Sequence, residues 1–182
     1  MALTSTVHHF NVGLSDVDRG VYETLEFKAA RHPSESPKYL ATRVLAYCLE
    51  YGEGLAFSKG GLSDPDEPAL SVRDLTGQRT AWIEVGLPDA ARLHKAAKAA
   101  RRLAVYVHRD PEAWLAQLAG EKIHRADAID LYAFDRDFLA GFTRRIERRT
   151  TFELSVTDGN LYVTLGGETL EGTVLRLAMP DA

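Results

Sequence analysis

The sequence predicts a single α/β domain that carries additional antiparallel strands. The chain has 182 residues, of which 45% are hydrophobic, so it can bury one substantial core without a second domain. Between residues 36 and 107 the apolar pattern changes in the order helix, three strands, helix, strand. We see neither internal repeats nor a low-complexity linker, and we therefore expect residues 1–182 to form one domain.

The composition limits the classes of partner. A formal net charge of -4 gives no overall attraction to nucleic acid or to anionic membranes, so such binding requires a local basic patch. No segment approaches the ~20 apolar residues that span a bilayer. The first residues lack the basic flank and apolar run of a signal peptide. We therefore expect a soluble, cytoplasmic protein with no membrane partner.

The first elements are a hairpin and a helix. Residues 2–13 and 20–30 alternate apolar and polar side chains around a polar turn at residues 14–18, which predicts two long antiparallel strands. Ser34 or Ser36 can cap the helix that follows, with a proline in its first turn. Its apolar residues recur at helical spacing: Leu40, Val44, Tyr47, Cys48 and Tyr51. Because Cys48 is the one cysteine, no internal disulfide is expected.

After a short strand at residues 55–58, residues 63–87 predict an acidic hairpin with its turn at residues 75–78. Glu84 then returns beside the acidic start of the first strand. It interrupts the apolar run of residues 81–85, and an ionised carboxylate there is costly unless it is paired or bound to a metal. The carboxylates at this end could together hold a divalent cation, Mg²⁺ or Mn²⁺. The alternative is a partly exposed or salt-bridged strand glutamate.

The register of this hairpin decides which second carboxylate joins Glu84. A symmetric turn sets Glu84 opposite Ala69 and places Glu67 on the same face. A change of one residue in the turn sets Glu84 opposite Pro68 and places Asp66 on that face instead. The sequence leaves both registers open, and a solvated loop of turn-forming residues is the alternative for both acids.

A second helix is expected to begin at Pro88 and to precede a buried strand at residues 103–107. Each of the two paths, from Glu84 to the strand end and from Pro88 to Lys95, covers roughly 10 Å. The Glu84 and Lys95 side chains can therefore lie at the same height. A lysine beside a metal-bound carboxylate pair could activate water and stabilise charge on a phosphorane-like transition state. The alternative for Lys95 is a surface charge in one stripe with Arg92, Lys98 and Arg102.

The rest of the chain predicts four further features. We expect a short helix at residues 111–118, a strand at 128–134, a helix at 136–148 and a final meander with turns at 158–160 and 166–167.

Three other groups of polar residues are candidate sites. Residues 31–36 lie at a helix N-terminus, where free N–H groups attract phosphate, although Glu35 alternatively serves as a favourable first-turn charge. His8 and His9 have no third ligand at metal spacing, so no zinc site is expected there. The cluster of Arg144, Arg145, Arg148 and Arg149 fits helix capping on a solvated surface, with contact to nucleic acid as the alternative.

Three segments carry a family resemblance that runs over essentially the whole chain. Residues 30–35 (ARHPSE), 66–68 (DEP) and 82–89 (WIEVGLPD) resemble the YaeQ family of small bacterial proteins. YaeQ proteins are similar in fold to the PD-(D/E)XK nuclease superfamily, whose core is ordered αβββαβ. The resemblance therefore implies a mixed sheet with that core, flanked by helices and extended by N- and C-terminal antiparallel strands.

The resemblance also implies roles for residues. Superfamily members bind Mg²⁺ through an acid on the second core strand and an acid on the third, which match Asp66 or Glu67 and Glu84 here. The Val85 carbonyl would be a third ligand. Gly86 replaces the usual lysine two residues after the second acid, and Lys95 would supply the cation from the following helix. Glu35 resembles an additional acid that some members place on their first helix.

Two functions follow from this resemblance. The leading hypothesis is a Mg²⁺- or Mn²⁺-dependent nuclease in which Glu84, Lys95 and Glu35 act in catalysis on phosphodiesters. The rival is a catalytically inactive protein of the same fold that binds nucleic acid or a protein partner, and the missing lysine favours it. The family has no established biochemical activity, so the sequence leaves substrate and oligomeric state open.

Overall fold

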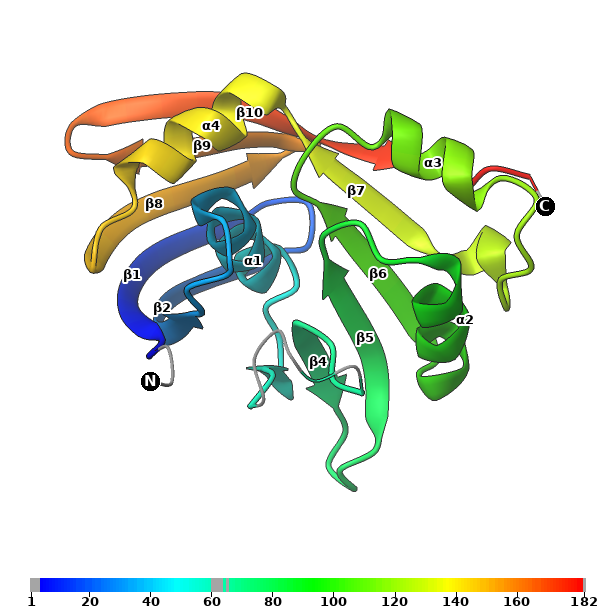
Figure 1. Cartoon of the computed structure of the whole chain (residues 1–182). Coiled ribbons are helices and arrows are strands. Elements are labelled where there is room, and N and C mark those ends of the chain that lie inside the picture. The colour runs from blue at the N-terminus through cyan, green and yellow to red at the C-terminus, as the bar shows by residue number, and fades with distance from the viewer. Residues whose placement is uncertain (1–3, 60–63, 65, 182) are drawn as a thin grey trace. The chain divides into compact units, whose positions relative to one another are not determined.

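The computed structural model describes residues 4–59, 64 and 66–181. The chain divides into two compact units: a first unit of residues 1–49 with 134–175, and a second unit of residues 50–133 with 176–182. Both combine strands with helices, and the described residues contain four α-helices (Figure 1). The predicted α/β class is confirmed, whereas one domain over residues 1–182 stays a prediction. The first residue of the predicted acidic hairpin, Ser63, lies outside the described residues.

The first unit is a mixed sheet with two helices. Its strands lie in the order β2-β1-β8-β9-β10, with β1 parallel to β8 and the other neighbours antiparallel. Its elements are β1 (Thr6–Asp16), β2 (Val21–Arg31), α1 (Pro37–Leu49), α4 (Arg136–Arg145), β8 (Arg149–Thr157), β9 (Asn160–Leu165) and most of β10 (Glu168–Leu177). The predicted opening hairpin, first helix and final meander are thereby confirmed.

The core of the first unit follows from alternation along its strands. Phe10 and Phe152 are buried on β1 and β8, and the Phe142 ring on α4 meets Phe152 edge-on at 5.1 Å between ring centroids. Because side chains alternate along a strand, β1, β8 and β9 each bury one apolar face. The helices α1 and α4 contact each other.

Two boundaries in the first unit differ from the prediction. The turn of the opening hairpin lies at residues 17–20, later than predicted, because the Asp16 carboxylate accepts from the backbone N–H (3.1 Å) and Nε (2.7 Å) of Arg19 and so closes the turn there. Helix α4 ends at Arg145 instead of residue 148, because the chain must extend to pair with β1: the backbone N–H of His9 donates to the Arg148 carbonyl at 2.8 Å.

The second unit has strands in the order β7-β6-β5-β4-β3. Strands β5, β6 and β7 are parallel, and β3, β4 and β5 are antiparallel. Its elements are β3 (Leu55–Phe57), β4 (Leu70–Arg73), β5 (Arg79–Val85), α2 (Ala90–Ala99), β6 (Arg102–Val107), α3 (Glu112–Leu118), a 3₁₀ turn (Ala126–Ala128) and β7 (Asp130–Phe134, its last residue in the first unit). The predicted chain order of helix, three strands, helix, strand is confirmed; its assignment to the nuclease superfamily stays a prediction.

Helix α2 covers one face of this sheet. Leu93 and Ala97 are buried on α2 and belong to one core cluster with Trp82 of β5 and Val105 of β6. The helix begins at Ala90 and not at Pro88, because the Asp89 side chain caps it by accepting from the Arg92 N–H at 2.8 Å. No helix within the described residues is long and apolar enough to cross a membrane.

Two glycines have the same backbone conformation but different surroundings. Substituting each of them measures how closely the β3–β4 hairpin is packed. Gly54 (φ +82) and Gly77 (φ +83) both adopt the left-handed region, but a Cβ at Gly54 would lie 2.0 Å from the Arg73 carbonyl oxygen, whereas one at Gly77 would meet nothing within 4 Å. We expect Gly77→Ala to lower the free energy of unfolding by about 1 kcal/mol through backbone strain alone. Gly54→Ala should cost about 3 kcal/mol, because a backbone carbonyl must also move. Urea titration measures both variants. Equal losses of unfolding free energy would contradict the close approach of Gly54 to the Arg73 carbonyl.

Candidate functional site

Strand β5 places Glu84 in the interior of the second unit, where the residue is 4% exposed. Leu70 pairs with Ile83 and Ser71 with Trp82, a register that continues to Ala69 opposite Glu84. This is the register predicted for a symmetric turn. The ladder shifts after Val72 by an irregularity that the sequence did not reveal.

Asp66 and Glu67 do not lie on β4, which begins only at Leu70. They form a turn before it, in which the Asp64 carboxylate accepts from the Asp66 N–H at 2.9 Å and the Asp64 carbonyl from the Glu67 N–H at 3.3 Å. Pro68 follows, and a proline cannot donate to a strand ladder. The prediction that one of these acids shares a strand face with Glu84 was therefore wrong.

The Glu84 carboxylate is paired with a residue of α2. Its Oε1 lies 2.8 Å from Nη2 of Arg92 and also accepts from the Trp82 indole N–H. The same Nη2 donates to the Glu67 backbone carbonyl at 2.9 Å. Arg92 thus joins Glu84 to the acidic turn.

The other two acids each have their own cation. Both carboxylate oxygens of Glu67 accept from Nη2 of Arg79, at 2.9 and 3.0 Å. Asp66 pairs with Lys95, whose hydrogen bond and charge lower the pKa of the Asp66 carboxyl. Lys95 therefore reaches the acidic turn, and Arg92, one helical turn earlier, is the residue that reaches Glu84.

The guanidinium groups of Arg79 and Arg92 also lie over the Trp82 ring, 4.9 and 5.8 Å from its centroid. Cation–π contact and charge pairing thus hold the same two side chains. Sequence analysis had placed Arg92 only in a surface stripe. The signal that it missed was the cap at Asp89, which starts the helix late and brings Arg92 into its first turn, near the end of β5.

The arrangement does not fit a divalent cation. Three carboxylates face three cations, so the cluster of Asp66, Glu67, Glu84, Arg79, Arg92 and Lys95 has no surplus negative charge to attract a metal. Within the described part of the chain, no group of three or more His, Cys, Asp or Glu side chains could hold a metal ion. Val85 is buried and paired in register with Tyr106, and its carbonyl as a ligand stays a prediction.

Glu35 lies in the first unit and precedes α1, instead of lying on the helix as the resemblance implied. The residue is 3% exposed, and its Oε2 lies 3.2 Å from Nη2 of Arg43. Its Oε1 has no hydrogen-bond partner among the described residues. Burial raises the pKa of the Glu35 carboxyl, and the charge of Arg43 opposes this only in part. A catalytic role for Glu35 stays a prediction.

Comparison with known proteins decides the family. The model of the family described as "YaeQ protein" matches residues 1–174. The chain belongs to the YaeQ family. It is 30% identical to "Uncharacterized protein YaeQ" of Escherichia coli K12 over 183 residues, covering 100% of both chains, and 30% identical to the Salmonella typhi protein over 173 residues, covering 94% of each.

Solved YaeQ structures share the fold. The chain aligns with the crystal structure of YaeQ from Pseudomonas syringae with a TM-score of 0.85, 32% identity and 96% coverage of each chain. It aligns with YaeQ from Xanthomonas axonopodis pv. citri with a TM-score of 0.86 and 30% identity, over 97% of this chain and 100% of that one. The predicted family is confirmed, and the names of the bacterial relatives assign them no activity.

The pair of Glu84 and Arg92 predicts a stability effect in this YaeQ protein. Arg92→Met leaves the Glu84 carboxylate buried without its ion-pair partner, so we expect the free energy of unfolding to fall by about 3 kcal/mol. The Arg92→Met/Glu84→Gln double variant should recover much of that loss, because the buried charge is gone. Urea titration of the single and double variants measures the coupling.

The matched control for that cycle is Lys95→Met, one turn along the same helix. Lys95 and Asp66 have side chains that are 57% and 69% exposed, so solvent screens their pair. We expect no measurable loss of stability. A loss as large as that of Arg92→Met would contradict the distinction between the buried and the exposed pair.

Glu35 predicts a pH effect. Its folded-state pKa is raised, so its contribution to stability is full below the unfolded value of about 4.3 and is lost as pH rises through the folded value. Relative to Glu35→Gln, the wild-type free energy of unfolding should therefore fall as the pH rises above the unfolded value. Urea titrations across that range check the sign. Glu26→Gln, an exposed position on β2, is the control and should show no such trend.

Proposed function

We propose that this YaeQ protein binds nucleic acid without hydrolysing it. The observation that carries the proposal is the ion pair of Glu84 with Arg92, which occupies the carboxylate that a catalytic metal would need. With Glu67 and Asp66 also paired to cations, the acidic cluster serves as a scaffold for cationic side chains. This supports the binding hypothesis over the catalytic one.

Nucleic acid is favoured over a protein partner because of the charges on α2. Arg92, Lys95 and Lys98 recur every three residues along one side of the helix, and Lys95 and Lys98 are exposed. Rows of cations bind the phosphate backbone through release of counterions. In a chain of net charge -4, nucleic-acid binding requires local positive charge. Lys98 supplies it together with Lys95, whose pair with Asp66 is exposed and can be exchanged for a phosphate.

A Mg²⁺- or Mn²⁺-dependent nuclease is the second candidate. It is favoured by the convergence of the predicted residues, because Arg92 contacts both Glu84 and the Glu67 backbone, and Lys95 contacts Asp66. Catalysis requires Arg92 to leave Glu84, so the two candidates differ in a measurable way.

Binding is tested by fluorescence anisotropy with labelled single- and double-stranded DNA and RNA at several salt concentrations. We expect the logarithm of the association constant to fall linearly with the logarithm of salt concentration. In Lys95→Ala/Lys98→Ala the slope should become shallower by roughly 1.5, because two phosphate contacts are lost. Arg109→Ala, which removes an exposed cation of the same unit outside α2, should leave the slope unchanged.

The same protein is then incubated with each nucleic acid and Mg²⁺ or Mn²⁺, beside Glu84→Gln and Lys95→Ala. We expect intact substrate in every reaction. Metal-dependent cleavage that both variants lose would overturn the proposal in favour of the nuclease. Absence of binding to any of the four nucleic acids at low salt would overturn both candidates.

A further inference from the structure

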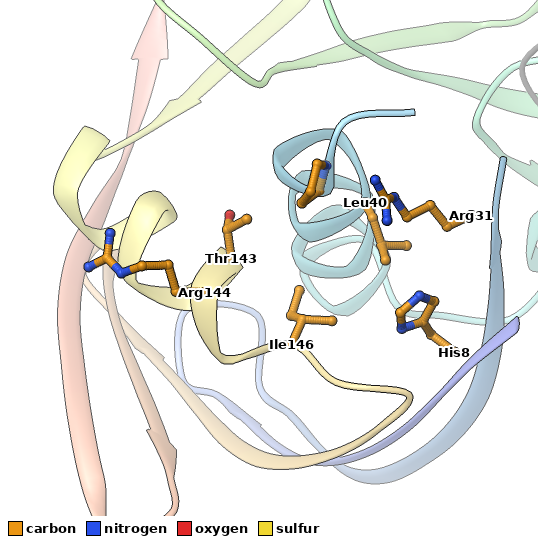
Figure 2. A pocket seen from close by; sticks show the side chains of 7 residues that line it. His8, Arg31, Leu40, Thr143, Arg144 and Ile146 are labelled. Carbon is orange, nitrogen blue, oxygen red and sulfur yellow. The ribbon is translucent and has the colours of Figure 1, made fainter. Parts of the chain in front are cut away.

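The first unit contains a pocket that the proposed function does not use. It has a volume of about 410 Å³, within the range of small-molecule sites. Its lining comes from the start of β1, the end of β2, the first turn of α1 and the end of α4: His8, Arg31, Pro37, Leu40, Thr143, Arg144 and Ile146 (Figure 2).

His8 gives the first sign of a ligand. The residue is 8% exposed, and Figure 2 shows its ring rising from β1 toward Leu40 and Arg31. Its Nδ1 lies 2.9 Å from the Glu147 backbone carbonyl, and because a carbonyl only accepts, Nδ1 carries the hydrogen. Its Nε2 is buried and has no hydrogen-bond partner in the described part of the chain. A buried nitrogen without a hydrogen-bond partner lowers the stability of the folded protein unless a ligand binds it.

Arg31 gives the second sign. Its Nε and Nη2 donate to the Glu35 backbone carbonyl at 3.1 and 3.0 Å, which holds the guanidinium at the start of α1. None of the seven lining residues is acidic. The carboxylate of Glu35 turns instead to Arg43. The charged lining side chains are therefore cationic.

The start of helix α1 is a further feature that favours an anion. The pocket adjoins the first turn of the 13-residue helix α1, whose N-terminal N–H groups favour an anion. Arg144 is exposed and points away from the pocket in Figure 2, so the inference does not depend on it.

The remaining lining is apolar. Pro37, Leu40 and Ile146 supply aliphatic surface beside the cationic groups. The Thr143 hydroxyl donates to the Leu139 carbonyl at 2.6 Å and keeps its oxygen free to accept. A ligand that fills this pocket thus has an anionic end and a larger, mainly apolar body.

We propose that this pocket binds a phosphate monoester, with the phosphate between His8 and Arg31 and the body of the ligand against Leu40 and Ile146. Once protonated, Nε2 of His8 donates to a phosphate oxygen, and Arg31 supplies a second charge-assisted donor. The group is carried either by a free mononucleotide or by the 5′ end of a nucleic acid. The proposal does not rest on the proposed function, because every residue named belongs to the first unit.

Isotope-labelled protein is titrated with inorganic phosphate, adenosine 5′-monophosphate and adenosine while the histidine ring signals are followed by NMR. His8→Asn identifies the His8 signal; its side-chain amide keeps a donor for the Glu147 carbonyl and removes Nε2. We expect the His8 signal to shift with both phosphates and not with adenosine. Affinity for adenosine 5′-monophosphate should fall at least tenfold in His8→Asn and stay unchanged in the matched control His9→Asn, on the other face of β1.

The two sources are distinguished with a short single strand that carries either a 5′-phosphate or a 5′-hydroxyl. Preference for the phosphorylated strand over the mononucleotide assigns the pocket to nucleic-acid ends, and the reverse assigns it to a free nucleotide. Equal binding of adenosine and its monophosphate, or no shift of the wild-type His8 signal with any phosphate, overturns the proposal. Backbone-to-ring correlations in the isotope-labelled wild-type protein also assign the His8 signal, so the wild-type titration decides even if His8→Asn does not fold.

Discussion

The second unit depends on one constraint: a carboxylate placed inside the protein must be neutralised where it lies. Glu84 lies on a strand covered by α2, beside Trp82 and the apolar core. Its charge fixes the position of Arg92, and Arg92 in turn contacts the acidic turn through the Glu67 carbonyl. A helix, a strand and a turn are therefore linked through a single guanidinium group.

The same pair bears on function. A planar guanidinium satisfies several acceptors at once and stays charged at any ordinary pH, which makes it a firm substitute for a metal ion. Lysine at the same point would be easier to displace. The cluster in this YaeQ protein thus has carboxylates arranged like those of a metal site, but its positive charge comes from side chains of the protein itself.

Local patterns predicted most of the fold. The opening hairpin followed from strict alternation, and α1 began at Pro37, with Ser36 accepting from the Tyr39 N–H at 3.1 Å as one of the two predicted caps. The pairing of Leu70 with Ile83 matches one of the two registers that the sequence left open. These features depend on neighbours in sequence, so a sequence reveals them.

The site was predicted less well because its contacts depend on where elements begin and end. Lys95 and Arg92 differ by one helical turn, and only the start of α2 after Asp89 decides which of them reaches Glu84. The turn formed by Asp64 removed Asp66 and Glu67 from the strand. His8 was considered only as a metal ligand and lacked a third ligand at metal spacing. Its bond to Glu147 joins residues 139 positions apart, so no local pattern indicated it.

The long separation in sequence between β1 and β8 also affects how the protein folds during synthesis. The first unit combines strands that lie far apart in sequence, and β1 cannot pair with its parallel neighbour β8 until the ribosome has synthesised the chain through residue 157. Until then β1 and β2 form a two-stranded hairpin, which is marginal in water. The second unit comes almost entirely from the continuous stretch 50–133, so it can fold earlier during synthesis. The nascent chain therefore exposes the apolar face of its first hairpin longest, and that hairpin is where chaperone contact would be concentrated.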